Sequence, residues 1–223
     1  MSFWKQISLL FVREFKTDWR NKNALSAVLL YLAASIFVVY MGFDMNKGFF
    51  NKVVWNTLYW IILVFAAFNA IGKSFVQEAE SKMLFLYFLV KPEALIVAKI
   101  LYNAMFMIVI GLLGLTLYVL VMGLPIQDMT LYLCLVFLSA LGFASTLTLI
   151  SSIAAQAQNS STLMAVIGFP LILPFLLLVL KVSKNALDGI ARSQSWNEIQ
   201  TISAIVVLSS AVSFMLFRFI WRG

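Results

Sequence analysis

Six long runs of apolar residues dominate the chain, and polar or charged residues gather in the segments between them. Each run is close to the roughly 20 residues that an α-helix needs to cross the apolar core of a bilayer. The runs cover residues 24–43, 53–71, 95–121, 131–155, 162–180 and 201–220. Charged residues occur only near their ends, where Lys99 and Arg218 can extend toward the headgroups. The pattern predicts an all-α, polytopic membrane protein with six transmembrane helices.

The segment before the first run has a different period. At 100° per residue, residues 3–22 place apolar and basic side chains on opposite faces of a helix. The apolar face holds Phe3, Ile7, Leu10, Phe11, Phe15 and Trp19, and the basic face holds Lys5, Arg13, Lys16 and Arg20. We expect residues 1–23 to form an amphipathic interfacial helix on the inner leaflet, ahead of a six-helix transmembrane domain of residues 24–223.

Two acidic residues of this segment, Glu14 and Asp18, are one turn apart and project near its apolar side. They could hang at the edge of the helix and pair locally, as Asp18 would with Lys22 four residues on. They could instead contact another subunit, including a second copy of this chain.

The composition agrees with a membrane protein, because 63% of the 223 residues are hydrophobic and 11% are charged, against about 25% charged in soluble domains. With the N-terminus inside, eleven of the 16 Lys and Arg residues lie on the inner side and five outside. The outer five are Lys47, Lys52, Lys181, Lys184 and Arg192. This asymmetry predicts that both termini are cytoplasmic. It also explains the net charge of +7 without nucleic acid as a partner.

The second inner segment, residues 72–92, begins with Gly72, Lys73 and Ser74, which look like the end of a phosphate-binding loop. The first glycine of that motif is replaced by Ala67, and no strand precedes it. We therefore expect no ATP site here. The segment continues with Glu78, Glu80 and a short apolar run that cannot span a bilayer. This run could pack against neighbouring helix ends or present a surface to a soluble partner, and the charged residues before it suit docking. Pro92 predicts a break before the third membrane helix.

Two further segments have distinctive patterns. Pro170 and Pro174, just after Gly168, remove hydrogen bonds from the fifth membrane helix, which predicts a kink or local unwinding. The prolines could serve helix packing or act as a hinge in a moving bundle. On the outer side, residues 181–200 are expected to form a loop with a short surface helix containing Leu187, Ile190 and Trp196.

The chain contains no histidine and one cysteine, Cys134, which is expected to be a small buried hydrophobe. The usual groups for metal ligation, proton relay and nucleophilic catalysis are missing, so we expect neither an enzyme nor a directly bound cofactor. The membrane-embedded polar residues are expected to bond helix to helix rather than to touch a substrate. They are Asn56, Asn69, Asn103, Ser145, Thr146, Thr148, Ser151 and Ser152.

Two stretches resemble the CcmB family, the haem exporter permeases of cytochrome c maturation, which are ABC-2-type membrane subunits. The first stretch is "SFVQEAESKMLFLYFLVKPEALIVAK", and its matching residues are Phe75, Glu78, Glu80, Leu84, Leu86, Leu89, Pro92, Ala98 and Lys99. The second is "LMAVIGFPLILPFLLLVL", which matches the family's double-proline segment. Length and span order agree over nearly the whole chain.

The resemblance implies a permease subunit of a bacterial inner-membrane complex. Its implied partners are a CcmA-like ATPase, CcmC- and CcmD-like membrane subunits and a CcmE-like haem chaperone. Haem would be a substrate rather than a cofactor, and ATP would act through the ATPase. The implied coupling segment contains Lys73, Phe75, Glu78 and Glu80, and the hinge contains Gly168, Pro170 and Pro174. Two alternatives remain: an ABC-2 permease for lipid, polysaccharide or drug, and a non-transporting membrane scaffold.

Overall fold

The computed structural model describes residues 2–20, 23–44, 51–72, 75, 90–157 and 160–220. Within these ranges the chain is helical and contains no strand. The elements are α1 (Phe3–Arg20), α2 (Asn23–Asp44), α3 (Lys52–Ile71), α5 (Pro92–Met122), α6 (Met129–Ala154), α7 (Ser160–Asp188), the 3-10 helix η1 (Arg192–Ser195) and α8 (Trp196–Ile220). Six of the α-helices, all but α1, are long and apolar enough to cross a membrane. The predicted all-α architecture with six spans is confirmed.

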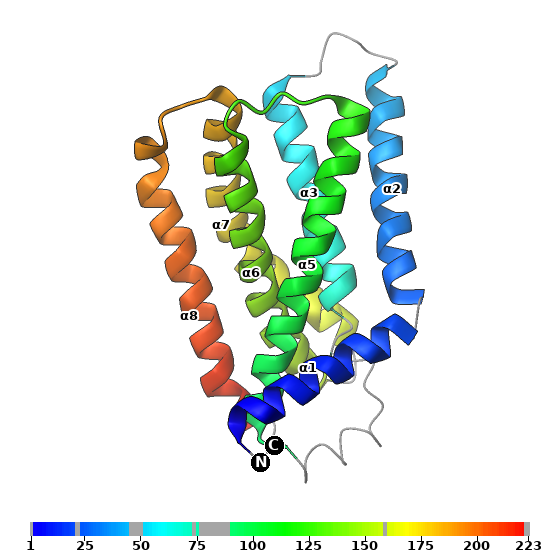
Figure 1. The fold of residues 1–223 in the computed structure, drawn as a ribbon, viewed down its shortest axis with the longest axis vertical. Coiled ribbons are helices and arrows are strands. Elements are labelled where there is room, and N and C mark those ends of the chain that lie inside the picture. The colour runs from blue at the N-terminus through cyan, green and yellow to red at the C-terminus, as the bar shows by residue number, and fades with distance from the viewer. Residues whose placement is uncertain are drawn as a thin grey trace.

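The spanning helices stand side by side, and α1 runs obliquely across one end of the bundle, which we call the α1 end (Figure 1). The last turn of α8 lies at this end as well, whereas the connections between α5 and α6 and between α7 and α8 lie at the opposite end. The first and the last helix of the described chain, α1 and α8, therefore lie together at the α1 end.

Helix α6 is the centre of the bundle. In its most apolar 18-residue window 61% of the residues are buried, against 17% in α2 and in α8. Large buried aromatic side chains such as Tyr132 and Phe143 pack from α6 into the main hydrophobic core. Helices α2 and α8 instead flank the bundle and expose many apolar side chains, as helices facing lipid do.

The break before the third span is where the sequence predicts it. Lys91 is extended, with φ −68° and ψ 133°, and Pro92 is the first residue of α5. A proline at this position loses no helical hydrogen bond, because the first N–H groups of a helix have no partner within it.

The expected outer loop of residues 181–200 is wrong. Helix α7 continues to Asp188, and Leu187 is fully buried in the core rather than resting on a membrane surface. The helix ends at Gly189, whose φ of +69° places it in the left-handed region. The N–H of Ile190 then donates to the carbonyl of Asn185 at 3.0 Å, which closes a Schellman-type cap. Trp196 begins α8.

Helix α7 runs without interruption through Pro170 and Pro174, so the prolines do not unwind a turn. Both prolines are exposed on the outside of the bundle. Gly168 is buried, and a Cβ added there would lie 2.7 Å from the ring of Phe68. The ring of Phe68 also stacks on that of Phe169, with centroids 4.5 Å apart. Gly168 therefore allows α3 and α7 to approach closely. That Gly168, Pro170 and Pro174 act as a hinge stays a prediction.

Cys134 is exposed, so its expected burial is wrong. It lies on the outward side of α6, near the end of the bundle opposite α1. A thiol is a weakly polar group, and a surface that faces acyl chains accepts it as readily as a protein core does.

Candidate functional site at the α1 end of the bundle

The apolar face of α1 packs on protein. Ile7 and Leu10 are each 5% exposed and belong to a cluster with Ala94, Leu95 and Phe217, which come from α5 and α8. The sequence places this face correctly, and at Ile7 and Leu10 it contacts protein rather than lipid, whereas Phe15 of the same face is 43% exposed. That α1 lies at the membrane interface stays a prediction. Apolar area on α5 and α8 is available at this end, and burying the face against it removes both surfaces from water.

The first acidic residue of that face forms an ion pair with α5. The Nζ of Lys99 lies 3.6 Å from Oε2 of Glu14. The Lys99 side chain is 1% exposed and that of Glu14 is 13% exposed. Lys99 therefore does not extend toward the headgroups as expected. A buried ammonium group needs an opposite charge close by, and the pattern of α1 provides one.

The second acidic residue also turns toward α5. The hydroxyl of Tyr102 donates to Oδ2 of Asp18 at 2.6 Å. The ring of Tyr102 lies 6.1 Å from that of Phe11 in an edge-on arrangement. The contacts that the structure gives to Glu14 and Asp18 thus lie within the chain, and Lys22, the proposed local partner of Asp18, is outside the described residues.

The predicted coupling segment begins beside the same lysine. Phe75 is 2% exposed, and the Nζ of Lys99 lies 4.6 Å from the centroid of its ring. The ring is also 5.4 Å from that of Phe217 on α8. Such burial means that Phe75 cannot present its ring to a soluble protein in this conformation. Lys73, Glu78 and Glu80, the other residues predicted for this segment, lie outside the described residues.

A serine of α6 fixes the backbone on either side of this turn. The hydroxyl of Ser151 donates to the carbonyl of Gly72 at 3.1 Å and accepts the N–H of Phe75 at 3.3 Å. Ser151 is fully buried. One side chain of the central helix therefore holds the point at which the chain leaves α3.

We refer to Glu14, Gly72, Phe75, Lys99 and Ser151 together as the junction. Its members come from α1, from the end of α3 and the residues after it, from α5 and from α6, and Phe217 adds α8. A displacement of the chain after α3 would therefore act on five helices at one place. The sequence indicated Phe75, Lys99 and the acidic residues separately, but it gave no sign that they meet.

Other embedded polar residues link helices as predicted. Asn103 donates to Thr148 at 2.8 Å, which joins α5 to α6, and the hydroxyls of Ser145 and Ser209 lie 2.6 Å apart between α6 and α8. Asn69 and Ser152 are exceptions, since each donates to a carbonyl of its own helix, that of Phe65 and that of Leu149.

The end opposite α1 contains a buried polar and aromatic cluster that sequence reasoning missed. The hydroxyl of Ser183 accepts from Asn56 at 2.8 Å and from Trp60 at 2.9 Å, and the hydroxyl of Tyr132 donates to Asn56 at 3.2 Å. The rings of Trp55 and Trp60 are almost fully buried here. These contacts satisfy the buried polar atoms that they involve, as expected for a set of groups that hold helices together.

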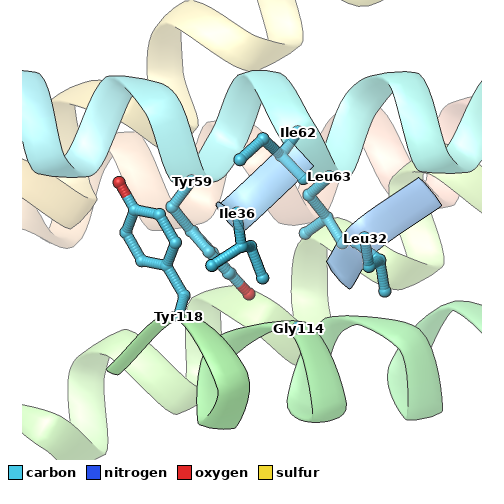
Figure 2. A pocket seen from close by; sticks show the side chains of 7 residues that line it. All are labelled: Leu32, Ile36, Tyr59, Ile62, Leu63, Gly114 and Tyr118. Atoms are coloured by element: carbon cyan, nitrogen blue, oxygen red, sulfur yellow. The ribbon is translucent and has the colours of Figure 1, made fainter. Parts of the chain in front are cut away.

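Figure 2 shows an apolar gap between α2, α3 and α5. Its lining residues are Leu32, Ile36, Tyr59, Ile62, Leu63, Gly114 and Tyr118. The empty volume is about 200 Å³, open solvent included, below the roughly 300–1,000 Å³ of pockets that hold drug-sized ligands. The hydroxyls of Tyr59 and Tyr118 donate to backbone carbonyls, of Gly111 at 3.0 Å and of Trp55 at 3.1 Å. We therefore interpret the gap as imperfect packing between the three helices rather than as a ligand site.

Among the described residues, no group of three or more His, Cys, Asp or Glu side chains could hold a metal ion. The charged residues of the junction face one another and are buried.

Comparison with known protein families gives a match over nearly the whole chain. A family model described as "CcmB protein" matches residues 5–218, from the first turn of α1 to nearly the end of α8. No individual curated protein matches the chain.

Proposed function

The chain belongs to the CcmB family, the membrane permease subunits of an ABC-type haem exporter in cytochrome c maturation, and we propose that it relays the motion of a partner ATPase through the junction. ATP would be bound and hydrolysed by a CcmA-like subunit in a separate chain. The resulting motion would drive haem export, or the release of a haem-loaded CcmE-like chaperone, with CcmC- and CcmD-like subunits in the same complex.

The α1 end would face the cytoplasm in this arrangement. The distribution of Lys and Arg residues supports it, because eleven of 16 fall on that side. A cytoplasmic α1 end puts Gly72 and Pro92, the two ends of the predicted coupling segment, on the side where a soluble ATPase would bind.

The observation that carries the proposal is the burial of Phe75 against Lys99. The ring and the ammonium group are 4.6 Å apart, and Ser151 fixes the backbone beside them. If the ATPase pulls on the chain around Glu78 and Glu80, the first described residue that the force meets is Phe75. From there the force reaches α5 through Lys99 and α1 through Glu14.

Helix α7 would absorb the resulting tilt. Pro170 and Pro174 each lack an N–H donor, so the helix has fewer hydrogen bonds to resist bending there. Their outward position leaves room for a change in curvature without displacing core side chains. Gly168 would keep α7 in contact with Phe68 of α3 during the movement.

The test is charge reversal in the predicted docking segment. We expect Glu78→Lys together with Glu80→Lys to reduce co-purification with the ATPase and the ATPase activity measured in reconstituted vesicles. Asp188→Lys is the matched control, because it reverses an exposed charge at the opposite end, where the ion pair with Lys52 is long, at 3.9 Å. Assembly and activity that equal the wild type in the Glu78 and Glu80 variant would contradict the docking proposal.

A transporting subunit and a scaffold differ in one further measurement. If the chain couples ATP hydrolysis to delivery, the stimulated ATPase activity depends on the haem-loaded chaperone. A scaffold would hold the ATPase at the membrane with the same activity whether or not the chaperone is present.

A further inference from the structure

The face of α1 that points away from the bundle combines exposed apolar and basic side chains. Leu9 and Val12 are 53% and 42% exposed, and Lys16 and Arg20 are exposed beside them. A shallow groove of about 340 Å³ runs along this face. Its lining residues are Leu9, Val12, Arg13, Lys16, Thr17 and Arg20.

The acidic side chains of α1 lie on its inner face and the basic ones of the groove on its outer face. Glu14 and Asp18 turn inward to Lys99 and Tyr102 of α5, and no carboxylate is among the described residues that line the groove. Of the groove cations, Arg13 lies 3.8 Å from Glu14. The groove cations follow one another at intervals of three and four residues, which places them along one side of a helix. The groove is thus a positively charged surface with an apolar floor.

We propose that this groove binds the phosphate of an anionic phospholipid in the leaflet at the α1 end. Lys16 and Arg20 contact the phosphate, with Arg13 beside it, and Leu9 and Val12 pack against the upper part of an acyl chain. Guanidinium and ammonium groups are the side chains that bind phosphate in proteins. Lys16 and Arg20 have no ion-pair partner among the described residues, so both are available.

A lipid fits this surface better than a soluble acidic partner does. Trp4, on the same helix, is 74% exposed, and tryptophan is enriched at the boundary between headgroups and acyl chains. Leu9 and Val12 would remain in water under a soluble anion, whereas a phospholipid covers them and neutralises the cations together. The inner face of α1 would then bind the bundle and its outer face the leaflet, without involvement of the ATPase.

The test uses the full chain purified in mild detergent. It is offered equal amounts of phosphatidylglycerol and phosphatidylcholine with the same acyl chains, and retained lipid is measured by native mass spectrometry. We expect the wild type to retain phosphatidylglycerol preferentially. In the variant Lys16→Gln with Arg20→Gln we expect that preference to fall by about fivefold per removed charge.

Two controls separate the site from total charge and from folding. Lys184→Gln removes an exposed cation at the opposite end and should leave the preference unchanged, while Lys16→Arg should retain it. The proposal is overturned if the double variant keeps the wild-type preference, or if the wild type has none. It is also overturned if inorganic phosphate displaces phosphatidylglycerol more effectively than chloride does at matched ionic strength, because the groove would then bind free phosphate.

Discussion

The Nζ of Lys99 lies 3.6 Å from Oε2 of Glu14 inside the seam between α1 and α5, with the lysine side chain 1% exposed. This ion pair joins the amphipathic N-terminal helix α1 to the spanning helix α5. Together with the hydrogen bond from Tyr102 to Asp18, it explains why two acidic residues lie on the apolar side of α1, where a helix resting on lipid alone would not place them.

Because the pair is buried, we expect the loss of one of its charges to destabilise the fold more than the loss of both. Glu14→Leu leaves a buried ammonium group without this carboxylate, so we expect it to lower the free energy of unfolding by about 3–5 kcal/mol. The double variant Glu14→Leu with Lys99→Met removes both charges and should lie within about 1 kcal/mol of the wild type. Denaturant titration in detergent measures both values. A double variant as unstable as the single one would show that the pair is not the reason for the loss.

At the end opposite α1, an ion pair joins the connection between α5 and α6 to the segment before α8. We expect this pair to make the stability of the fold depend on pH. Arg192 donates to both carboxylate oxygens of Asp128, at 2.6 Å and 2.8 Å, and these bonds lower the pKa of Asp128 below its ordinary value. A lowered pKa in the folded state stabilises the fold above the ordinary pKa of about 3.9. This contribution is lost as the pH falls through the folded-state pKa.

We therefore expect the melting temperature to fall more steeply in acid for the wild type than for Asp128→Asn. We expect the difference to be small, because the arginine is exposed and solvent screens the pair. Arg192→Gln serves as the control, since it leaves Asp128 but removes the group that lowers its pKa. Parallel curves for all three proteins would show that the pair does not contribute to acid sensitivity.

The hinge predicts a separation of stability from function. Pro170→Ala with Pro174→Ala restores two backbone donors within α7, so we expect the free energy of unfolding to rise, by up to about 3 kcal/mol per site. Cytochrome c maturation in cells should fall, while the complex still assembles. Pro125→Ala, in the connection between α5 and α6, is the control and should affect neither. Undiminished maturation in the double variant would exclude the hinge.

The elements that could be predicted from the sequence are those governed by a local pattern. Apolar runs fixed all six spans to within a few residues, except where α7 extends past residue 180 to Asp188. That extension was missed because a helix that leaves the bilayer can continue through polar residues. The available signal was Gly189, which suits the left-handed residue that ends a helix.

The junction could not be predicted in the same way. Periodicity showed that Glu14 shares a face with Ile7 and Leu10, but it cannot show which helix covers that face. Lys99 was assigned to the headgroups because a lysine near the end of a span usually extends there. Its burial depends on a partner from α1, and such a pairing between distant segments is decided by tertiary packing.

The central claim is that motion passes from the segment after α3 through Phe75 to Lys99. Its most direct test is the number of chaperone molecules released per ATP hydrolysed, in vesicles that contain the chain, its ATPase partner and haem-loaded chaperone. Phe75→Leu keeps an apolar side chain at the junction but removes the contact with the ammonium group. The matched control is Phe214→Leu, at an exposed position on α8.

We predict that Phe75→Leu binds the ATPase as the wild type does but releases less chaperone per ATP, because the buried cation–π contact that joins the chain after α3 to α5 is missing. Phe214→Leu should match the wild type. Wild-type release per ATP in Phe75→Leu, with the ATPase bound, would contradict transmission through this contact.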